Sequence, residues 1–239
     1  ELRYQLLPYN YHLAFENSTQ GLPLMRPLFT EEPNNFELYT LSKAYLWGND
    51  FLISPILEPG QSQKKVYFPK TSNWFDFYTH KKYAAGNFEM INTHETYIPT
   101  FVRAGAFIPV ARVHQSTDNY KFNQLNFKYF YEAELKTSKR SYYNDDGETA
   151  NSFQDSAFEM LHLRFDHFED VSELEIHHEV EKNFDSDLKT IHLEVINWKK
   201  RPISVVYNGM TLSYEFENQT LLIKEIPVEE GKSQLLIRH

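Results

Sequence analysis

The sequence predicts a mainly β protein in which two β-sandwich domains follow a short α-β-α segment. Two observations support this fold class. From residue 51 onward, short apolar runs alternate with Pro, Gly, Asn and Asp, which is typical of strands joined by turns. Aromatic residues make up 16% of the chain, and their side chains favour strands. With 239 residues, the chain is long enough to bury a sizeable core.

The first fifty residues carry a different pattern. Residues 2–16 have apolar side chains at helical spacing, so we expect an amphipathic helix that Pro8 kinks. Residues 22–29 are nearly all apolar without alternation, which is typical of a parallel strand buried on both faces. A second short helix is expected near residues 36–45. Because an α-β-α fragment cannot close a sheet by itself, we interpret residues 1–50 as the C-terminal end of a (β/α)8 barrel.

Two β blocks are expected after this segment. The candidate strands of the first block are residues 51–57, 65–68, 73–78, 88–92 and 97–110. Those of the second block are residues 127–135, 157–165, 174–180, 190–197, 203–207, 211–216 and 221–226. Asn208-Gly209 is a strong signal for a two-residue hairpin turn. A polar connector is expected at residues 114–124, so we predict a proximal β-sandwich over residues 51–118 and a distal one over residues 119–239.

Composition excludes several classes of protein. The formal net charge is −9 and no basic cluster is present, which argues against a nucleic-acid partner. No apolar run is long enough to span a bilayer, so no membrane partner is expected. There is no cysteine, hence neither a disulfide framework nor thiolate chemistry. The chain starts at Glu1 without an export signal of its own and is expected to be a mature or truncated product. Its compartment stays undetermined, with a periplasmic or extracellular location slightly favoured.

Four stretches of the chain carry recognisable motifs. The most specific is Tyr142-Tyr143-Asn144-Asp145-Asp146-Gly147-Glu148-Thr149, an aromatic strand end that runs into an acidic turn in which Gly147 supplies a positive φ. The other three are Gly21-Leu22-Pro23-Leu24-Met25-Arg26-Pro27-Leu28-Phe29, Trp74-Phe75-Asp76-Phe77-Tyr78-Thr79 and Ile98-Pro99-Thr100-Phe101-Val102-Arg103-Ala104-Gly105-Ala106-Phe107-Ile108-Pro109. In this order, the four stretches resemble the C-terminal part of glycoside hydrolase family 31, the α-glucosidases, α-xylosidases and α-galactosidases.

The resemblance implies both an architecture and an activity. Members of this family have a catalytic barrel followed by proximal and distal β-sandwiches. Two Asp carboxylates, about 5 to 5.5 Å apart in retaining enzymes, act as nucleophile and acid. Both lie on barrel strands that would precede Glu1, so no residue of this chain inherits a catalytic role. The chain would be the accessory, inactive segment of a retaining α-glycosidase that hydrolyses terminal α-linked glucosides or related α-glycosides. Its partners would be an α-linked oligosaccharide and the N-terminal barrel portion, with no cofactor.

Some residues are candidates for roles within this framework. Arg26 and Phe29 come from the expected last barrel strand, whose C-terminal end faces the active site, so either is a candidate for lining the substrate pocket. An ion pair inside the barrel is the alternative for Arg26, because a buried guanidinium normally requires a carboxylate. The remaining motif residues are expected to be structural: Trp74, Asp76, Arg103, Gly105, Asp145, Asp146 and Gly147.

Alternative interpretations remain open at this stage. Asp145, Asp146 and Glu148 could instead bind Ca²⁺, but too few ligands are present and the spacing is not that of an EF-hand. Ten histidines invite a metal site, yet no spacing within a single strand brings two imidazoles onto one face, so no metal is expected. The chain could also be a stand-alone carbohydrate-binding protein that stacks sugars on Trp74, Tyr78 or Trp198, or a purely structural interaction domain. His80 stands where the family usually has Gly, and neither this nor other departures indicate which sugar is cleaved.

Overall fold

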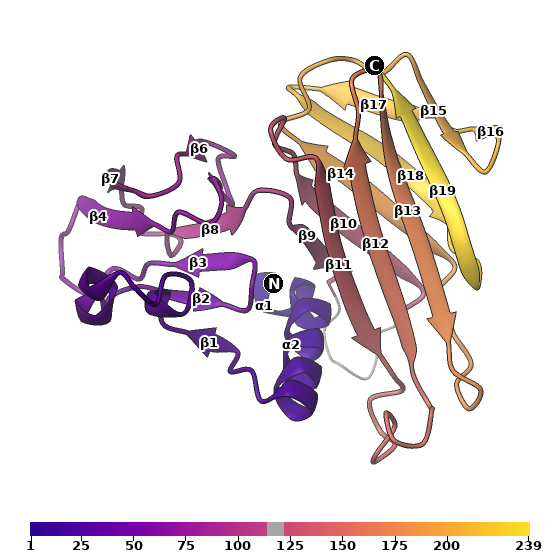
Figure 1. Cartoon of the computed structure of the whole chain (residues 1–239), viewed down its shortest axis with the longest axis horizontal. Helices are drawn as coiled ribbons and strands as arrows, with labels where there is room; N and C mark the ends of the chain where they lie inside the picture. The colour runs from indigo at the N-terminus through magenta and orange to yellow at the C-terminus, as the bar shows by residue number, and fades with distance from the viewer. Residues whose placement is uncertain (114–121) are drawn as a thin grey trace. The chain divides into compact units, whose positions relative to one another are not determined.

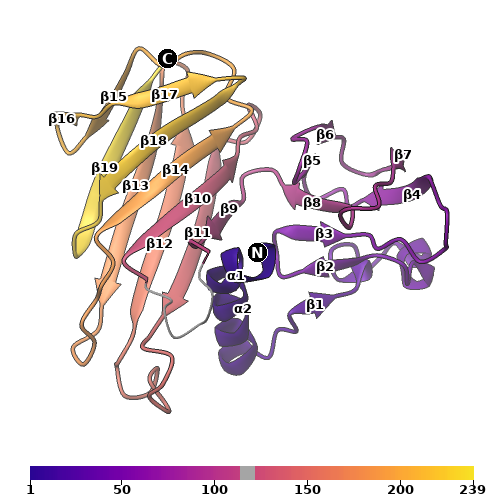
Figure 2. The same ribbon diagram turned by 180° about the vertical axis from the view of Figure 1, so that it is seen from behind.

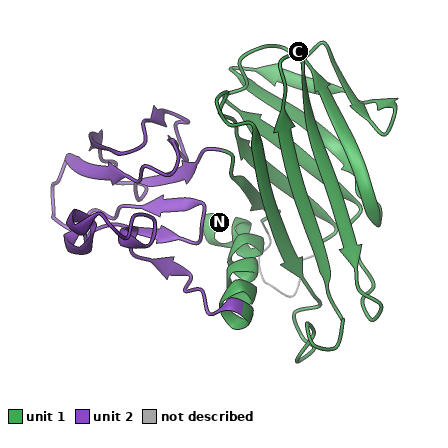
Figure 3. Ribbon diagram, viewed as in Figure 1, with its two compact units in different colours: residues 1–19, 105–239 green, residues 20–104 purple. Residues whose placement is uncertain are grey.

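The computed structural model describes residues 1–113 and 122–239 (Figures 1 and 2). These residues form two compact units: unit 1 contains residues 1–19 and 105–239, and unit 2 contains residues 20–104 (Figure 3). Most of the expected connector, residues 114–121, lies outside the described residues, as does the predicted boundary after residue 118. The predicted domains 1–50, 51–118 and 119–239 stay a prediction.

Unit 1 is a sandwich of two sheets, which the two opposite views of Figures 1 and 2 show face on. The five-stranded sheet has the order β17 (Tyr214–Glu217), β18 (Thr220–Pro227), β14 (Thr190–Ile196), β10 (Gln124–Phe130) and β9 (Phe107–Val110). The six-stranded sheet has the order β11 (Thr137–Asn144), β12 (Glu159–His167), β13 (Val171–Val180), β19 (Gly231–Arg238), β15 (Ser204–Tyr207) and β16 (Met210–Thr211). The predicted mainly β fold is confirmed.

Alternating side chains explain why these strands pack as a sandwich. Along β12 and β13 buried and partly exposed positions alternate, as expected for strands with one face in a core. Phe107, Tyr129 and Phe165 meet in this core, with ring centroids 4.5 Å and 4.8 Å apart in the two successive pairs. The Asn208-Gly209 turn between β15 and β16 is confirmed, and both residues have positive φ, 44° and 84°.

The N-terminal helix of unit 1 is confirmed, with an interruption. It is divided into α1 (Leu2–Gln5) and α2 (Leu7–Gln20), and Leu6 separates the two. Pro8 is the second residue of α2, where its missing N–H removes no helical hydrogen bond. The buried residues of this helical segment are Leu6, Pro8, Tyr9 and Leu13. No helix in the described part of the chain is long and apolar enough to cross a membrane.

Unit 2 contains an antiparallel sheet, whose strands differ in length, and a separate hairpin. The sheet has the order β1 (Met25–Arg26), β2 (Tyr45–Trp47), β3 (Phe51–Ile53), β8 (Thr100–Arg103), β5 (Trp74–Asp76) and β6 (Lys82–Tyr83). The hairpin pairs β4 (Gln63–Phe68) with β7 (Asn87–Asn92). Side chains from both, among them Leu52, Phe68 and Phe101, share one apolar core.

One local prediction is wrong and two are only partly right. Residues 22–29 do not form a buried parallel strand: β1 has two residues, pairs antiparallel with β2, and leaves Met25 64% exposed. Pro23 and Pro27 lack the N–H groups that a longer strand would need. The expected helix at residues 36–45 is a 3-10 turn, Phe36–Thr40, followed by β2. The expected strand 97–110 is divided into β8 and β9 by a turn at Gly105, where φ is 76°.

Candidate functional site

The acidic turn after β11 is built by its own side chains. Asp146 Oδ1 accepts hydrogen bonds from the backbone N–H groups of Glu148 and Thr149, at 3.0 Å and 2.8 Å. Its Oδ2 accepts a hydrogen bond from the Thr149 hydroxyl. Gly147 has φ 73°, so the predicted positive φ is confirmed. Asp146 therefore holds the loop in the way an N-cap side chain holds the start of a helix.

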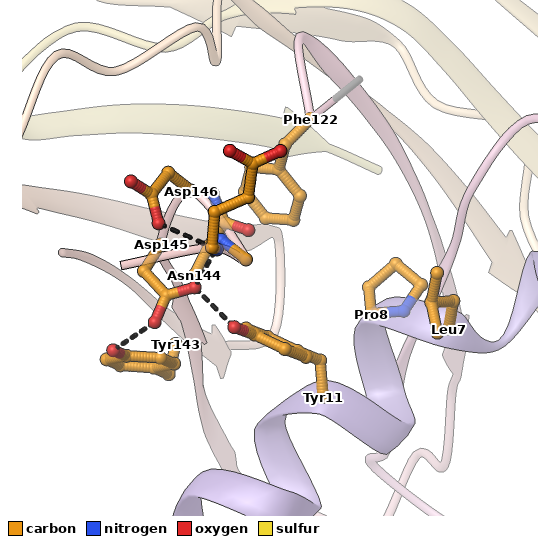
Figure 4. A pocket seen from close by; sticks show the side chains of 10 residues that line it. Leu7, Pro8, Tyr11, Phe122, Tyr143, Asn144, Asp145 and Asp146 are labelled. Atoms are coloured by element: carbon orange, nitrogen blue, oxygen red, sulfur yellow. Dashed lines mark hydrogen bonds between the residues drawn. The ribbon is translucent and has the colours of Figure 1, made fainter. Parts of the chain in front are cut away.

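Asp145 ties this turn to α2 of the same unit (Figure 4). The hydroxyl of Tyr11 and the backbone N–H of Gly147 donate to Oδ1, the latter at 2.9 Å. The hydroxyl of Tyr143 donates to Oδ2 at 2.7 Å. The Asp145 carboxylate thus receives three hydrogen-bond donors. One of them, Tyr11, lies on a helix and precedes Asp145 by 134 residues.

Aromatic contacts reinforce the same junction. The rings of Phe15 and Tyr143 stack with centroids 4.2 Å apart and an interplanar angle of 3°. The backbone N–H of Tyr143 donates to His12 Nδ1 at 3.2 Å. Beside them lies a cavity of about 440 Å³, which Leu7, Phe122 and the acidic turn line (Figure 4). The acidic turn, which belongs to the most specific sequence motif, therefore lines a cavity.

The electrostatics of the turn argue against acid-base chemistry. Burial and the neighbouring Asp145 raise the pKa of both Tyr11 and Tyr143, so both hydroxyls stay protonated and act as donors. The hydroxyl and N–H of Thr149 lower the pKa of Asp146, which keeps that carboxylate ionised. A general acid needs the opposite shift. The two aspartates are suited to hold structure because their oxygens already have donors.

A buried polar cluster supports the end of β11. Glu159 is 1% exposed and accepts hydrogen bonds from Asn144 Nδ2 at 2.7 Å and from the Ser186 hydroxyl. His178 Nε2 lies 2.7 Å from the same carboxylate. A buried carboxylate normally requires such partners. Sequence reasoning missed this cluster because its members are distant in sequence. The signal that could have revealed it was the position of Glu159 opposite the His-rich strand β13.

In unit 2 the predicted structural residues lie together on β5 and β8. Trp74 is paired with Arg103, whose guanidinium carbon lies 4.8 Å from the centroid of the indole ring. Trp74 Nε1 donates to the carbonyl of Pro69 at 3.0 Å, and Arg103 Nη2 lies 2.8 Å from Glu31 Oε1. Asp76 Oδ1 accepts the backbone N–H groups of residues 78 and 79 at 2.9 Å and 2.7 Å. These contacts give each residue a structural use.

Gly105 occupies a position that only glycine fits. A Cβ atom there would lie 2.3 Å from Leu135 Cδ2 and 2.5 Å from Ser138 Oγ. Its φ of 76° adds a second restriction. The backbone N–H of Gly105 donates to the carbonyl of Phe130 at 2.8 Å, which holds Gly105 at the end of β10.

The candidates for lining the substrate pocket are Arg26 and Phe29, and each makes its own contacts. Arg26 is 8% exposed, and its guanidinium donates to the carbonyl of Pro23 and to Asn49 Oδ1, at 2.8 Å and 2.5 Å. Phe29 stacks on Tyr39 with centroids 4.6 Å apart. A role of either residue in binding substrate stays a prediction.

Two histidines meet across neighbouring strands. His162 on β12 stands directly opposite His177 on β13, with ring centroids 5.6 Å apart, because strand pairing joins residues that sequence spacing keeps apart. The expectation concerned spacing within a single strand, so this contact between two strands does not contradict it. Glu179 lies 3.4 Å from His162 and 3.3 Å from His177. Among residues 1–113 and 122–239, no group of three or more His, Asp or Glu side chains is arranged to hold a metal ion.

Comparison with known proteins identifies the class of protein to which this fold belongs. The model of the glycosyl hydrolase family 31 C-terminal domain matches residues 21–108. Alpha-glucosidase 2 of Bacillus thermoamyloliquefaciens is 34% identical over 148 residues, which are 62% of this chain and 18% of that protein. A probable glucan 1,3-alpha-glucosidase of Oryza sativa subsp. japonica is 35% identical over 171 residues, 69% of this chain and 18% of that protein.

Solved structures extend the match to both units. The family 31 dextranase of Flavobacterium johnsoniae, solved with isomaltotriose, superposes with a TM-score of 0.91 and 25% identity over 100% of this chain and 32% of its own. The chain therefore belongs to glycoside hydrolase family 31, as its motifs predicted, and corresponds to the C-terminal region of the members it matches. It spans about a fifth of the length of the curated relatives. No complete (β/α)8 barrel is present in the described residues.

Proposed function

We propose that this chain is the accessory C-terminal region of a retaining α-glycosidase, which hydrolyses terminal α-linked glucosides or related α-glycosides. Support for the reaction class comes from the relatives, one an α-glucosidase and one a dextranase solved with isomaltotriose. The chain itself supplies β-sandwich structure, and the barrel portion of the same polypeptide supplies the two catalytic carboxylates. We expect the chain alone to be inactive.

The observation that carries the accessory role is the use of the carboxylates in the motifs. A retaining glycosidase needs one free carboxylate as nucleophile and a second that holds a proton at neutral pH. Asp145 receives donors from Tyr11, Tyr143 and Gly147, and Asp146 has its pKa lowered by Thr149. Asp76 is occupied by two backbone N–H groups. None of the three meets the requirement for either role.

The alternative of a stand-alone sugar-binding protein is less well supported. Trp74 is 0% exposed and Trp198 is 2% exposed, so neither offers a ring face to a sugar. Of the three aromatic residues suggested by the sequence, Tyr78 alone reaches the surface, with 36% exposed.

Activity assays test the proposal. The purified chain should release no p-nitrophenol from p-nitrophenyl α-glucoside or α-xyloside. The longer protein that includes a barrel should hydrolyse one of them, with the α-anomer as first product in NMR spectra. Turnover by the chain alone that disappears in Asp76→Asn or Asp145→Asn would contradict the accessory role. Inversion of the anomer would contradict the retaining mechanism.

A further inference from the structure

A second cavity, in unit 2, differs from the one beside the acidic turn. It has a volume of about 540 Å³ and is lined by residues 55–62, which join β3 to β4, and by residues 93–98, which join β7 to β8. Two contacts hold the connections together: the backbone N–H of Thr93 donates to the carbonyl of Ser62 at 3.0 Å, and its hydroxyl donates to the carbonyl of Gln61. The volume is within the usual range for small-molecule sites, about 300 to 1,000 Å³.

The rings of His94 and Tyr97 line one side of this cavity, and Tyr78 packs on Tyr97 without lining it. Tyr97 lies between two neighbours: its centroid is 4.2 Å from that of Tyr78 and 4.6 Å from that of His94. The rings of His94 and Tyr97 are close to parallel, at 24°. Tyr78 and His94 are exposed. Burial raises the pKa of both tyrosines, so their hydroxyls stay protonated and serve as donors at neutral pH.

The polar groups of this cavity are available for a ligand. Within residues 1–113 and 122–239, the side chains of Ser62, Glu95 and Thr96 make no hydrogen bond. By contrast, the aspartates of the acidic turn already have donors for their oxygens. The lining contains neither Lys nor Arg, so it offers no permanent cation to a phosphate or carboxylate. Its chemistry fits a neutral ligand with many hydroxyl groups and apolar ring faces.

We propose that this cavity binds a sugar unit of an α-linked glucan chain, with the exposed ring of His94 beneath the pyranose ring and Thr96, Glu95 and Ser62 on its hydroxyl groups. The choice of an α-glucan, rather than another neutral sugar, rests on the proposed function. Aromatic rings bind the C–H faces of sugars through apolar contact, while short polar side chains read the hydroxyl groups. The site lies in the region of the family-model match, at residues 21–108.

Calorimetric titration of the 239-residue chain with isomaltotriose tests the site. We expect saturable binding that His94→Ala weakens at least about tenfold, equivalent to about 1.4 kcal/mol. Thr96→Ala, which removes a side chain without a contact in the described structure, should weaken it about threefold or more. Phe153→Ala removes another exposed ring, 42% exposed, from unit 1 and should leave the affinity unchanged. Melting curves verify that each variant is folded.

Thr96→Ala decides the outcome if His94→Ala does not fold. The proposal is overturned if the unchanged chain shows no saturable binding. It is equally overturned if both folded cavity variants bind isomaltotriose as tightly as the Phe153→Ala control. These outcomes leave the proposed function standing, because that proposal is tested by hydrolysis in the longer protein and requires no binding by the isolated chain.

Discussion

The two units each contain an aspartate-centred turn, and the two turns differ in where the left-handed residue lies. Asp76 in unit 2 and Asp146 in unit 1 both accept the N–H groups of the residues two and three positions later. In unit 1 a glycine, Gly147, takes the positive φ of the turn, 73°. In unit 2 the left-handed residue is His80, four positions after Asp76 rather than directly after it, with φ 61°.

The comparison shows which part of each turn is essential. An L residue in the left-handed region costs about 1 to 2 kcal/mol, and the Asp76 turn is formed despite that cost. Both turns therefore rely on the carboxylate and its two N–H donors, whereas the place and the residue type of the left-handed residue differ. Unit 1 adds a second aspartate, Asp145, that reaches a helix, so its turn is also a junction.

The largest effect is expected where a positive φ and a crowded position coincide. Gly105→Ala places a Cβ 2.3 Å from Leu135 Cδ2 at a φ of 76°, so it should lower the free energy of unfolding by roughly 2 to 5 kcal/mol. Gly147→Ala has a similar φ but no atom within 4 Å of the new Cβ, and should cost roughly 1 to 2 kcal/mol. Urea unfolding measures both. Equal losses would mean that crowding at Gly105 is relieved elsewhere.

The two units should also respond differently to acid. His167 in unit 1 is buried among Tyr129 and Ser172, and burial lowers its pKa to about 4. An unfolded histidine titrates near about 6.5, so in the window between these values the unfolded chain binds the extra proton. Unit 1 should therefore have its full stability above about pH 6.5 and lose up to about 3 kcal/mol as the pH falls to about 4.

Urea unfolding followed by NMR signals from each unit checks this pH effect. His167→Gln should remove most of the slope between about pH 4 and 6.5 in unit 1. Unit 2 has two histidines, His80 and His94, and neither is buried. Replacing the latter, His94→Gln, should leave the slope of both units unchanged. A slope in unit 1 that survives His167→Gln would assign it to other groups.

The smallest effect is expected from placing a glycine at the left-handed position of the Asp76 turn. His80→Gly relieves the strain of a left-handed L residue but increases the flexibility of the unfolded chain, so the gain in stability should not exceed about 1 kcal/mol. Thermal unfolding at several protein concentrations measures it. A clear loss of stability would mean that the His80 side chain contributes contacts that outweigh its backbone strain.

Local sequence patterns predicted the strands well, but they could not predict contacts between residues that are distant in sequence. Alternating burial in β12 and β13 follows directly from side chains on opposite faces of a strand, so its existence and approximate bounds could be predicted. The positive φ of Gly147 followed from turn chemistry. The apolar run at residues 22–29 led to the wrong prediction of a buried strand. Its two prolines limit strand pairing more than its hydrophobicity favours it.

The candidate sites depend on tertiary contacts that no spacing reveals. Tyr11 and Asp145 are 134 positions apart, and nothing in either local pattern links them. His162 and His177 meet because β12 and β13 pair in one particular register. The cavity at residues 55–62 and 93–98 exists because two connections between strands are held together. Sequence motifs thus identified the family and the turns, whereas the free polar groups lie in segments without a motif.

The account makes one central claim about the family motif: the acidic turn holds α2 on the sandwich of unit 1 and does no chemistry. A double-mutant cycle between Tyr11→Phe and Asp145→Ala, measured by urea unfolding of the chain, tests it most directly. We predict a coupling energy of about 1 to 2 kcal/mol, since the hydroxyl donates to a charged acceptor. The control cycle pairs Tyr11→Phe with Asp166→Ala, whose carboxylate binds Thr137 and Arg164 instead, and should be additive. A coupling below about 0.3 kcal/mol for Tyr11 and Asp145 would contradict the claim.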